Sequence, residues 1–178
     1  LRDFLHDYIL IELSPTVADH AKTHPPGYSV ALYLLYRAFG VSYLGMAIFT
    51  VVIGALVLWP LFVLWREEVG AAAARHALEI FVFLPSFVLM TATSTEAIFL
   101  TLVWTTIAAA AIGLKRSWTI SAVAGLSAAL ALFCSFLFLL LTPWFGYLLW
   151  RVYSRAPVEL RTQVWVRVLT SLLVFTGF

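Results

Sequence analysis

The chain has 178 residues, of which 63% are hydrophobic and only 11% are charged, and it contains a single cysteine. Soluble domains are roughly 45–50% apolar and about 25% charged, so this composition excludes a water-soluble globule, a disordered chain, a disulfide scaffold and a nucleic-acid-binding protein. The remaining class is an all-α polytopic membrane protein, in which the placement of charges is more informative than the formal net charge of +2.

Residues 1–40 differ from the rest of the chain and are expected to form an outer loop followed by a short helix. All three aspartates and three of the four histidines lie within the first 24 positions. Pro25 and Pro26 predict a stiff turn, because each proline fixes its own φ and restricts the residue before it. A helix from this turn to Gly40 would be about 20 Å long, too short to cross a bilayer.

This short helix is predicted to be amphipathic and to lie in the plane of the membrane interface. The alternative is a packing helix that only joins two spans. The residues that would share its polar face are Ser29, Tyr33, Tyr36 and Arg37.

Residues 41–178 are expected to form one bundle of transmembrane helices. The apolar stretches 41–65, 71–90 and 97–114 each suit one crossing, with turns at 66–70 and 91–96. Pro85 is expected to kink the second of these helices, which membrane helices tolerate when neighbours satisfy the freed backbone groups.

Residues 118–150 carry no charge and fit either one crossing or two short ones. Two crossings, with a turn near Cys134 and Ser135, are favoured because they keep the arginines that follow on the same side as Lys115 and Arg116. The last apolar run, 164–178, is short for a span. Because the chain starts without methionine and stops inside an apolar run, it is expected to be a piece of a longer membrane protein.

The basic residues predict the orientation of the bundle. Lysine and arginine accumulate in cytoplasmic loops, so the basic clusters are placed inside and the acidic, histidine-rich segment outside, at the plasma or inner membrane. The clusters are Arg66 with Arg75, Lys115 with Arg116, and the group of Arg151, Arg155, Arg161 and Arg167. Trp65, Trp118 and Trp150 each stand beside one of these clusters, as interfacial tryptophans do.

An ordered set of motifs resembles the GT-C superfamily of polytopic glycosyltransferases, in particular the branch of protein O-mannosyltransferases and aminoarabinose transferases. The set is an acidic loop, a His-Pro-Pro-Gly turn, an aromatic interfacial helix, a basic inner turn, a span with proline and a Thr/Ser-acid outer turn. The matching residues are His24, Pro25, Pro26, Gly27 and Tyr28 with Phe39 and Gly40, then Gly70 with Ala73 and Ala74, Pro85, Thr93, Ser94, Thr95 and Glu96.

The resemblance implies transfer of a sugar from a polyprenyl-phosphate-linked donor to a lipid, glycan or protein acceptor on the outer face. In that family an outer-loop aspartate acts as general base or helps hold a divalent metal ion, and Asp3 and Asp7 are the candidates here. The family's aspartate usually lies further upstream of the Pro-Pro turn, so the base could also precede Leu1. The expected partners of the lipid phosphate and donor are Lys22, His20, His24, Arg37 and Glu96.

Several of these residues also have simpler interpretations. Thr93 and Glu96 fit a capping box that opens the next helix. Glu79 follows Arg75 by four residues, which predicts an ion pair. His20 and His24 are four residues apart, but the prolines interrupt helical geometry and no His-Glu-x-x-His motif is present, so no zinc site is predicted.

Two other functions are compatible with a chain of this composition. A transporter or flippase subunit would place polar residues or paired broken helices in the middle of the membrane. A non-catalytic membrane scaffold would tolerate changes at Asp7, His24 and Glu96.

Overall fold

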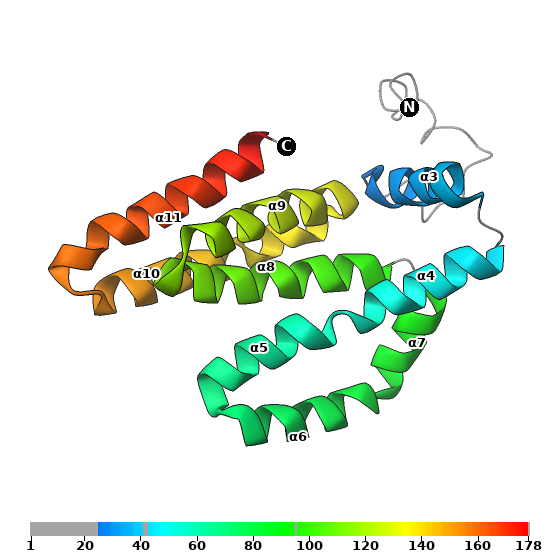
Figure 1. Cartoon of the computed structure of the whole chain (residues 1–178), viewed down its shortest axis with the longest axis horizontal. Helices are drawn as coiled ribbons and strands as arrows, with labels where there is room; N and C mark the ends of the chain where they lie inside the picture. Colours follow the sequence, from blue (N-terminus) through cyan, green and yellow to red (C-terminus); the bar gives the residue numbers. More distant parts are fainter. Residues whose placement is uncertain (1–24, 41–42, 95, 178) are drawn as a thin grey trace.

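The computed structural model describes residues 25–40, 43–94 and 96–177, and all their regular elements are helices (Figure 1). Three stretches are long and apolar enough to cross a membrane: Leu44–Val69, Glu96–Arg116 and Phe136–Arg155. The predicted all-α class is therefore confirmed, and length and composition indicate a membrane protein.

Helix α3 (Gly27–Phe39) begins at the Pro-Pro turn, as predicted. It ends at Gly40, which adopts a left-handed conformation with φ 56° and donates its N–H to the carbonyl of Tyr36. Glycine suits this position because it has no Cβ to clash. All four residues of the predicted polar face are exposed, whereas Val30 on the other side is buried.

The first predicted span consists of two helices, α4 (Tyr43–Ala55) and α5 (Leu58–Val69). The predicted turn at 66–70 is wrong in extent, because α5 continues to Val69 and only Gly70, with φ 87°, leaves the helix. Arginine and glutamate are good helix formers, so the helix continues until a glycine permits a positive φ.

The second predicted span is also divided into two helices, α6 (Ala71–Val82) and α7 (Pro85–Thr93). The interruption at Phe83 and Leu84 directly precedes Pro85, which confirms the predicted kink. Proline has no N–H to donate within a continuous helix, but it is tolerated in the first turn of a new one.

Helix α8 (Glu96–Arg116) matches the third predicted span and forms a tight hairpin with α9 (Trp118–Cys134). Ser117 between them is extended, with φ −152° and ψ 134°. The hairpin is close because its inner residues are small: a Cβ on Gly113 would lie 2.7 Å from the backbone nitrogen of Ser121. The hydroxyl of Thr106 donates to that of Ser127 across the pair at 2.9 Å.

The uncharged stretch 118–150 is interrupted at Ser135, as predicted. Ser135 is extended (φ −159°), and its hydroxyl accepts a hydrogen bond from the backbone N–H of Leu137. The chain continues as a short 3₁₀ segment, η2 (Phe136–Leu141), and helix α10 (Thr142–Arg155).

Helix α11 (Val158–Gly177) includes the final apolar run and is longer than that run indicated. It packs along α9, where the hydroxyl of Ser171 donates to the carbonyl of Ser121 at 2.5 Å. Gly125 of α9 lies directly against the backbone of Ser171, so the two helices approach closely at this point.

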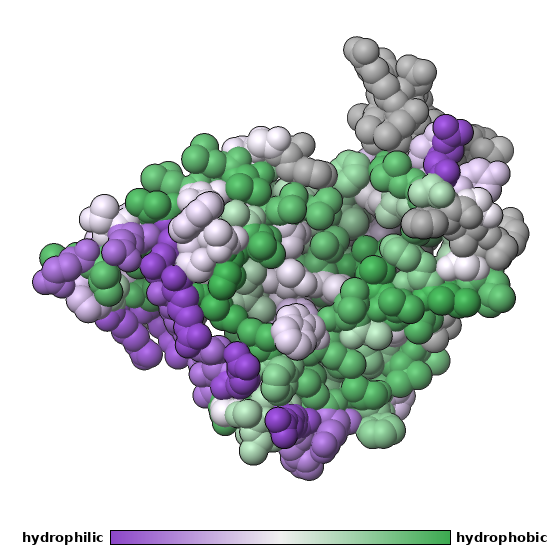
Figure 2. All heavy atoms as spheres, viewed as in Figure 1, coloured by the Kyte–Doolittle hydropathy of each residue, from purple (hydrophilic) through white to green (hydrophobic). Residues whose placement is uncertain are grey.

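Large apolar side chains lie mostly on the surface, whereas small ones fill the contacts between helices. Trp59, Phe83 and Leu140 are 72%, 82% and 73% exposed. Most of the buried residues of the α8–α9 hairpin are alanine, glycine, serine and threonine. Membrane helices pack in this way because lipid solvates large apolar side chains while small residues let backbones approach. In Figure 2, hydrophobic atoms cover the middle and hydrophilic atoms line the left and lower rim.

Candidate functional site

The bundle formed by the described helices has two ends, and the side chains at the two ends differ in their chemistry. In Figure 1 the α5–α6, α8–α9 and α10–α11 connections lie on the left, and α3, the end of α9 and the start of α8 lie on the right. We call the left side, with Glu67, Glu68, Lys115, Arg116 and Arg151, the basic end. We call the right side, with residues 25–28, Glu96 and Cys134, the turn end.

At the turn end, the Pro-Pro-Gly turn docks on the last turn of α9. Gly27 is buried, and a Cβ added to it would lie 2.5 Å from the carbonyl oxygen of Phe133 and 2.8 Å from Cα of Cys134. These atoms belong to the backbone and cannot rotate away. The turn therefore requires glycine at position 27 for a close approach, a reason that the sequence pattern alone does not reveal.

Tyr28 follows Gly27 and lies within electrostatic range of both Cys134 and Glu96. Burial raises the pKa of the Tyr28 hydroxyl far above its usual range, and negative charge on Cys134 or Glu96 would raise it further. The hydroxyl is therefore neutral at physiological pH: it can donate a hydrogen bond but cannot serve as a base. Sequence reasoning missed both Tyr28 and Cys134 as members of this cluster.

Glu96 is the first residue of α8 and is partly buried at the turn end. Its backbone N–H donates to the hydroxyl of Ser94 at 3.1 Å, so Ser94 caps this helix start. The side chain of Thr93, the capping residue expected from the sequence, lies outside the described residues.

The other predicted site residues divide into two groups. Arg37 is exposed in the last turn of α3, at the opposite end of that helix from Tyr28, so it does not join the turn-end cluster. The remaining candidates lie outside the described residues: Asp3, Asp7, His20, Lys22 and His24. His24 is nevertheless joined directly to Pro25, the first described residue of the docked turn.

The GT-C resemblance allows a divalent metal ion in the same region. Within residues 25–40, 43–94 and 96–177 no group of three or more His, Cys, Asp or Glu side chains could hold one. Asp3, Asp7 and His20, the residues on which such a site would depend, precede this part of the chain.

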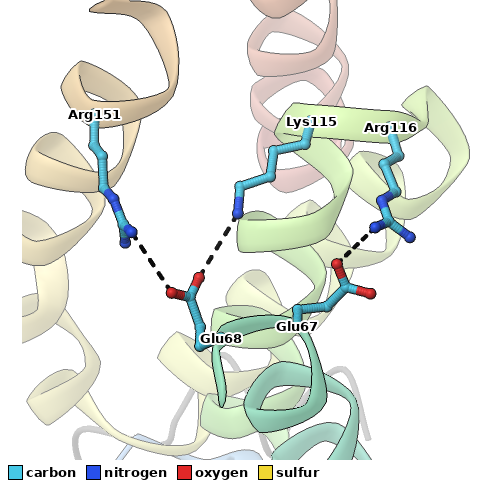
Figure 3. A network of polar contacts seen from close by, with 5 residues as sticks. All are labelled: Glu67, Glu68, Lys115, Arg116 and Arg151. Atoms are coloured by element: carbon cyan, nitrogen blue, oxygen red, sulfur yellow. Dashed lines mark hydrogen bonds and ion pairs between the residues drawn. The ribbon is translucent and has the colours of Figure 1, made fainter. Parts of the chain in front are cut away.

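At the basic end, two glutamates of α5 connect three helices (Figure 3). Glu68 lies between Lys115 of α8, at 3.7 Å, and Arg151 of α10, at 3.5 Å. Glu67 accepts a shorter bond, 2.6 Å, from Arg116. These pairs confirm that the basic clusters after the first, third and last predicted spans gather at one end of the bundle.

One predicted ion pair is wrong. Glu79 contacts His76, three residues earlier, at 3.4 Å, and no ion pair with Arg75 is formed in the part of the chain that the structure describes. Residues three apart on a helix are neighbours just as residues four apart are, and here the imidazole takes the place expected for the guanidinium.

Comparison with known protein families, curated protein sequences and solved structures finds no match to this chain.

Proposed function

We propose that this protein is a membrane glycosyltransferase that transfers a sugar from a polyprenyl-phosphate-linked donor to an acceptor hydroxyl at the turn end. The observation that carries the proposal is the docking of the Pro-Pro-Gly turn on α9, beside Tyr28 and Glu96. The polar segment that holds the candidate carboxylates leads directly into this turn. The GT-C resemblance of the ordered motifs supports the same assignment.

The proposed reaction divides the chemistry between carboxylates and cations. Asp7 or Asp3 accepts the proton of the acceptor hydroxyl. The oxygen of that hydroxyl bonds to the anomeric carbon of the sugar with inversion. The bond from that carbon to the phosphate oxygen breaks, and polyprenyl phosphate leaves. Donors and cations stabilise the negative charge that develops on this phosphate. The residues proposed for that role are Lys22, His20 and His24, with Glu96 contacting the donor; Arg37 is not assigned to it, because it lies at the far end of α3.

The experiment measures sugar transfer by the purified full chain reconstituted in lipid, using a panel of labelled polyprenyl-phosphate sugars. Loss of a general base typically costs about 100-fold or more in rate, so Asp7→Asn or Asp3→Asn should abolish most of the transfer. Glu79→Gln is the matched control, because this exposed carboxylate belongs to α6 and pairs with His76.

Two results would contradict the proposal. One is the absence of transfer from every donor in the panel by a folded wild-type protein. The other is transfer that survives unchanged in Asp3→Asn, Asp7→Asn and Glu96→Gln alike.

A further inference from the structure

A cleft of about 270 Å³ opens at the basic end between α8, α10 and α11. No acidic side chain among the described residues lines it. Its charged lining residues are Lys115, Arg151, Arg155 and Arg167. A cleft with walls of one charge sign concentrates the field of those charges and attracts anions.

The cations of this cleft are only partly neutralised by their neighbours. Lys115 and Arg151 share one carboxylate, that of Glu68. Arg155 forms no ion pair within the described part of the chain. Arg167 donates to the carbonyl of Leu114 at 3.0 Å and therefore helps to hold the wall of the cleft. The cleft thus carries a surplus of positive charge.

An apolar groove of about 340 Å³ continues from this cleft along the same helices, and Leu114 lines both. On α10, Leu149 lines the groove and Val152, about one turn further, lines the cleft. On α11, Val168 lines the groove and Val164, about one turn earlier, lines the cleft. The cleft and the groove therefore adjoin at Leu114, and we call the two together the channel.

We propose that this channel binds one anionic phospholipid, with its phosphate headgroup in the basic cleft and an acyl chain in the apolar groove. Only a ligand with a negative head joined to a hydrocarbon chain complements both parts. Basic pockets between transmembrane helices hold anionic headgroups, and arginine contacts phosphate through two parallel bonds. Trp118 and Trp150 are exposed at this end, as expected for side chains at headgroup depth.

The site is at the opposite end of the molecule from the proposed glycosyl transfer, so the two proposals stand or fall separately. A lipid bound here would connect α8, α10 and α11 at the point where Glu68 already links α8 and α10. Loss of lipid binding is therefore measured without reference to transfer activity.

The headgroup is tested by native mass spectrometry of the purified full chain titrated with phosphatidylglycerol or phosphatidylcholine. The wild type should retain phosphatidylglycerol preferentially. Each cation near a membrane surface contributes roughly fivefold to anionic lipid binding, so Arg155→Gln should weaken retention about fivefold and Arg151→Gln with Arg155→Gln about 25-fold. Arg75→Gln removes an exposed arginine outside the cleft and should leave retention unchanged.

The acyl-chain part of the site is tested by filling the groove. Ala128 lines it, so Ala128→Phe should reduce phosphatidylglycerol retention without changing any charge. Val123→Phe is the control, because Val123 is exposed on the same helix and does not line the groove. Thermal unfolding of each variant shows whether it is folded. If the double variant is unfolded, the single Arg155→Gln variant still tests the headgroup site.

Three outcomes would overturn the proposal. The first is equal retention of the two lipids by the wild type. The second is retention of phosphatidylglycerol by Arg155→Gln at the wild-type level. The third is binding of inorganic phosphate as tight as that of the lipid with no effect of Ala128→Phe, which would identify a site for free phosphate.

Discussion

Gly27 illustrates how a single residue positions the turn end. Its hydrogen atoms face the backbone of Phe133 and Cys134, where no side chain of any size fits. Inserting atoms into a tightly packed contact typically costs about 1–3 kcal/mol, because the surrounding backbone must shift. The contact matters for function under our proposal, since it attaches the segment that carries Asp3 and Asp7 to the bundle.

Gly27→Ala is therefore expected to release α3 from α9. Cys134 provides the measurement, because it is the only cysteine of the chain and is 5% exposed. Maleimide labelling of Cys134 in detergent should be faster in Gly27→Ala than in the wild type. Gly146→Ala is the control: a Cβ there meets nothing within 4 Å, so labelling should not change. Equal rates in all three proteins would show that α3 does not cover the thiol.

At the scale of elements, the α8–α9 hairpin depends on small side chains and on one polar contact between its helices. Thr106 and Ser127 are both buried, and their hydroxyls meet at 2.9 Å. Each hydroxyl also has a carbonyl of its own helix within hydrogen-bond distance as an alternative acceptor for its single hydrogen, Leu102 for Thr106 and Val123 for Ser127. Ser127 therefore keeps a partner when Thr106 is changed.

Thr106→Val should destabilise the protein only modestly. Hydrogen bonds between membrane helices contribute about 0.6 kcal/mol on average and rarely more than about 1.7 kcal/mol. Unfolding in mixed micelles measures the difference in free energy. Thr170→Val is the control, because that exposed hydroxyl bonds only within α11. If the free energy of unfolding falls no further in Thr106→Val than in Thr170→Val, packing alone joins α8 and α9.

At the scale of the whole molecule, separation of charge defines two ends with an apolar surface between them (Figure 2). Ion pairs from Glu67 and Glu68 bring the basic residues of α8 and α10 to the α5–α6 turn. Exposed ion pairs of this kind add at most about 1 kcal/mol each, so their main consequence is the sign of charge at this end. The positive-inside rule then predicts that the basic end faces the cytoplasm.

Cysteine accessibility in intact cells tests this orientation in a Cys134→Ala background. Cysteines at Lys115 and Arg155 should be labelled from the same face, because both positions line the basic cleft. A cysteine at Asp19 should be labelled from the opposite face. Labelling of Asp19 and Lys115 from one face would contradict the predicted orientation and the outer-face assignment of the donor site.

The sequence by itself determined the all-α class and several of the helix boundaries, but not the breaks between α4 and α5 or between α10 and α11. The apolar composition indicates a membrane protein, Pro85 removes a backbone donor, and Gly40 permits a left-handed cap, so these features follow from local chemistry. The interruption at Ser135 was predicted from the placement of arginines. The extension of α5 past Arg66 was not predicted, because the helix ends only where Gly70 follows it.

Only the tertiary structure decided which residues meet. The contact of Gly27 with α9, the proximity of Tyr28 to Glu96, and the channel from the basic cleft to the apolar groove each join residues far apart in the chain. Periodicity describes which face of one helix is apolar, but in a membrane protein every outward face is apolar as well. Which faces pack together is settled by the fit of small residues between helices, and that fit exists only in three dimensions.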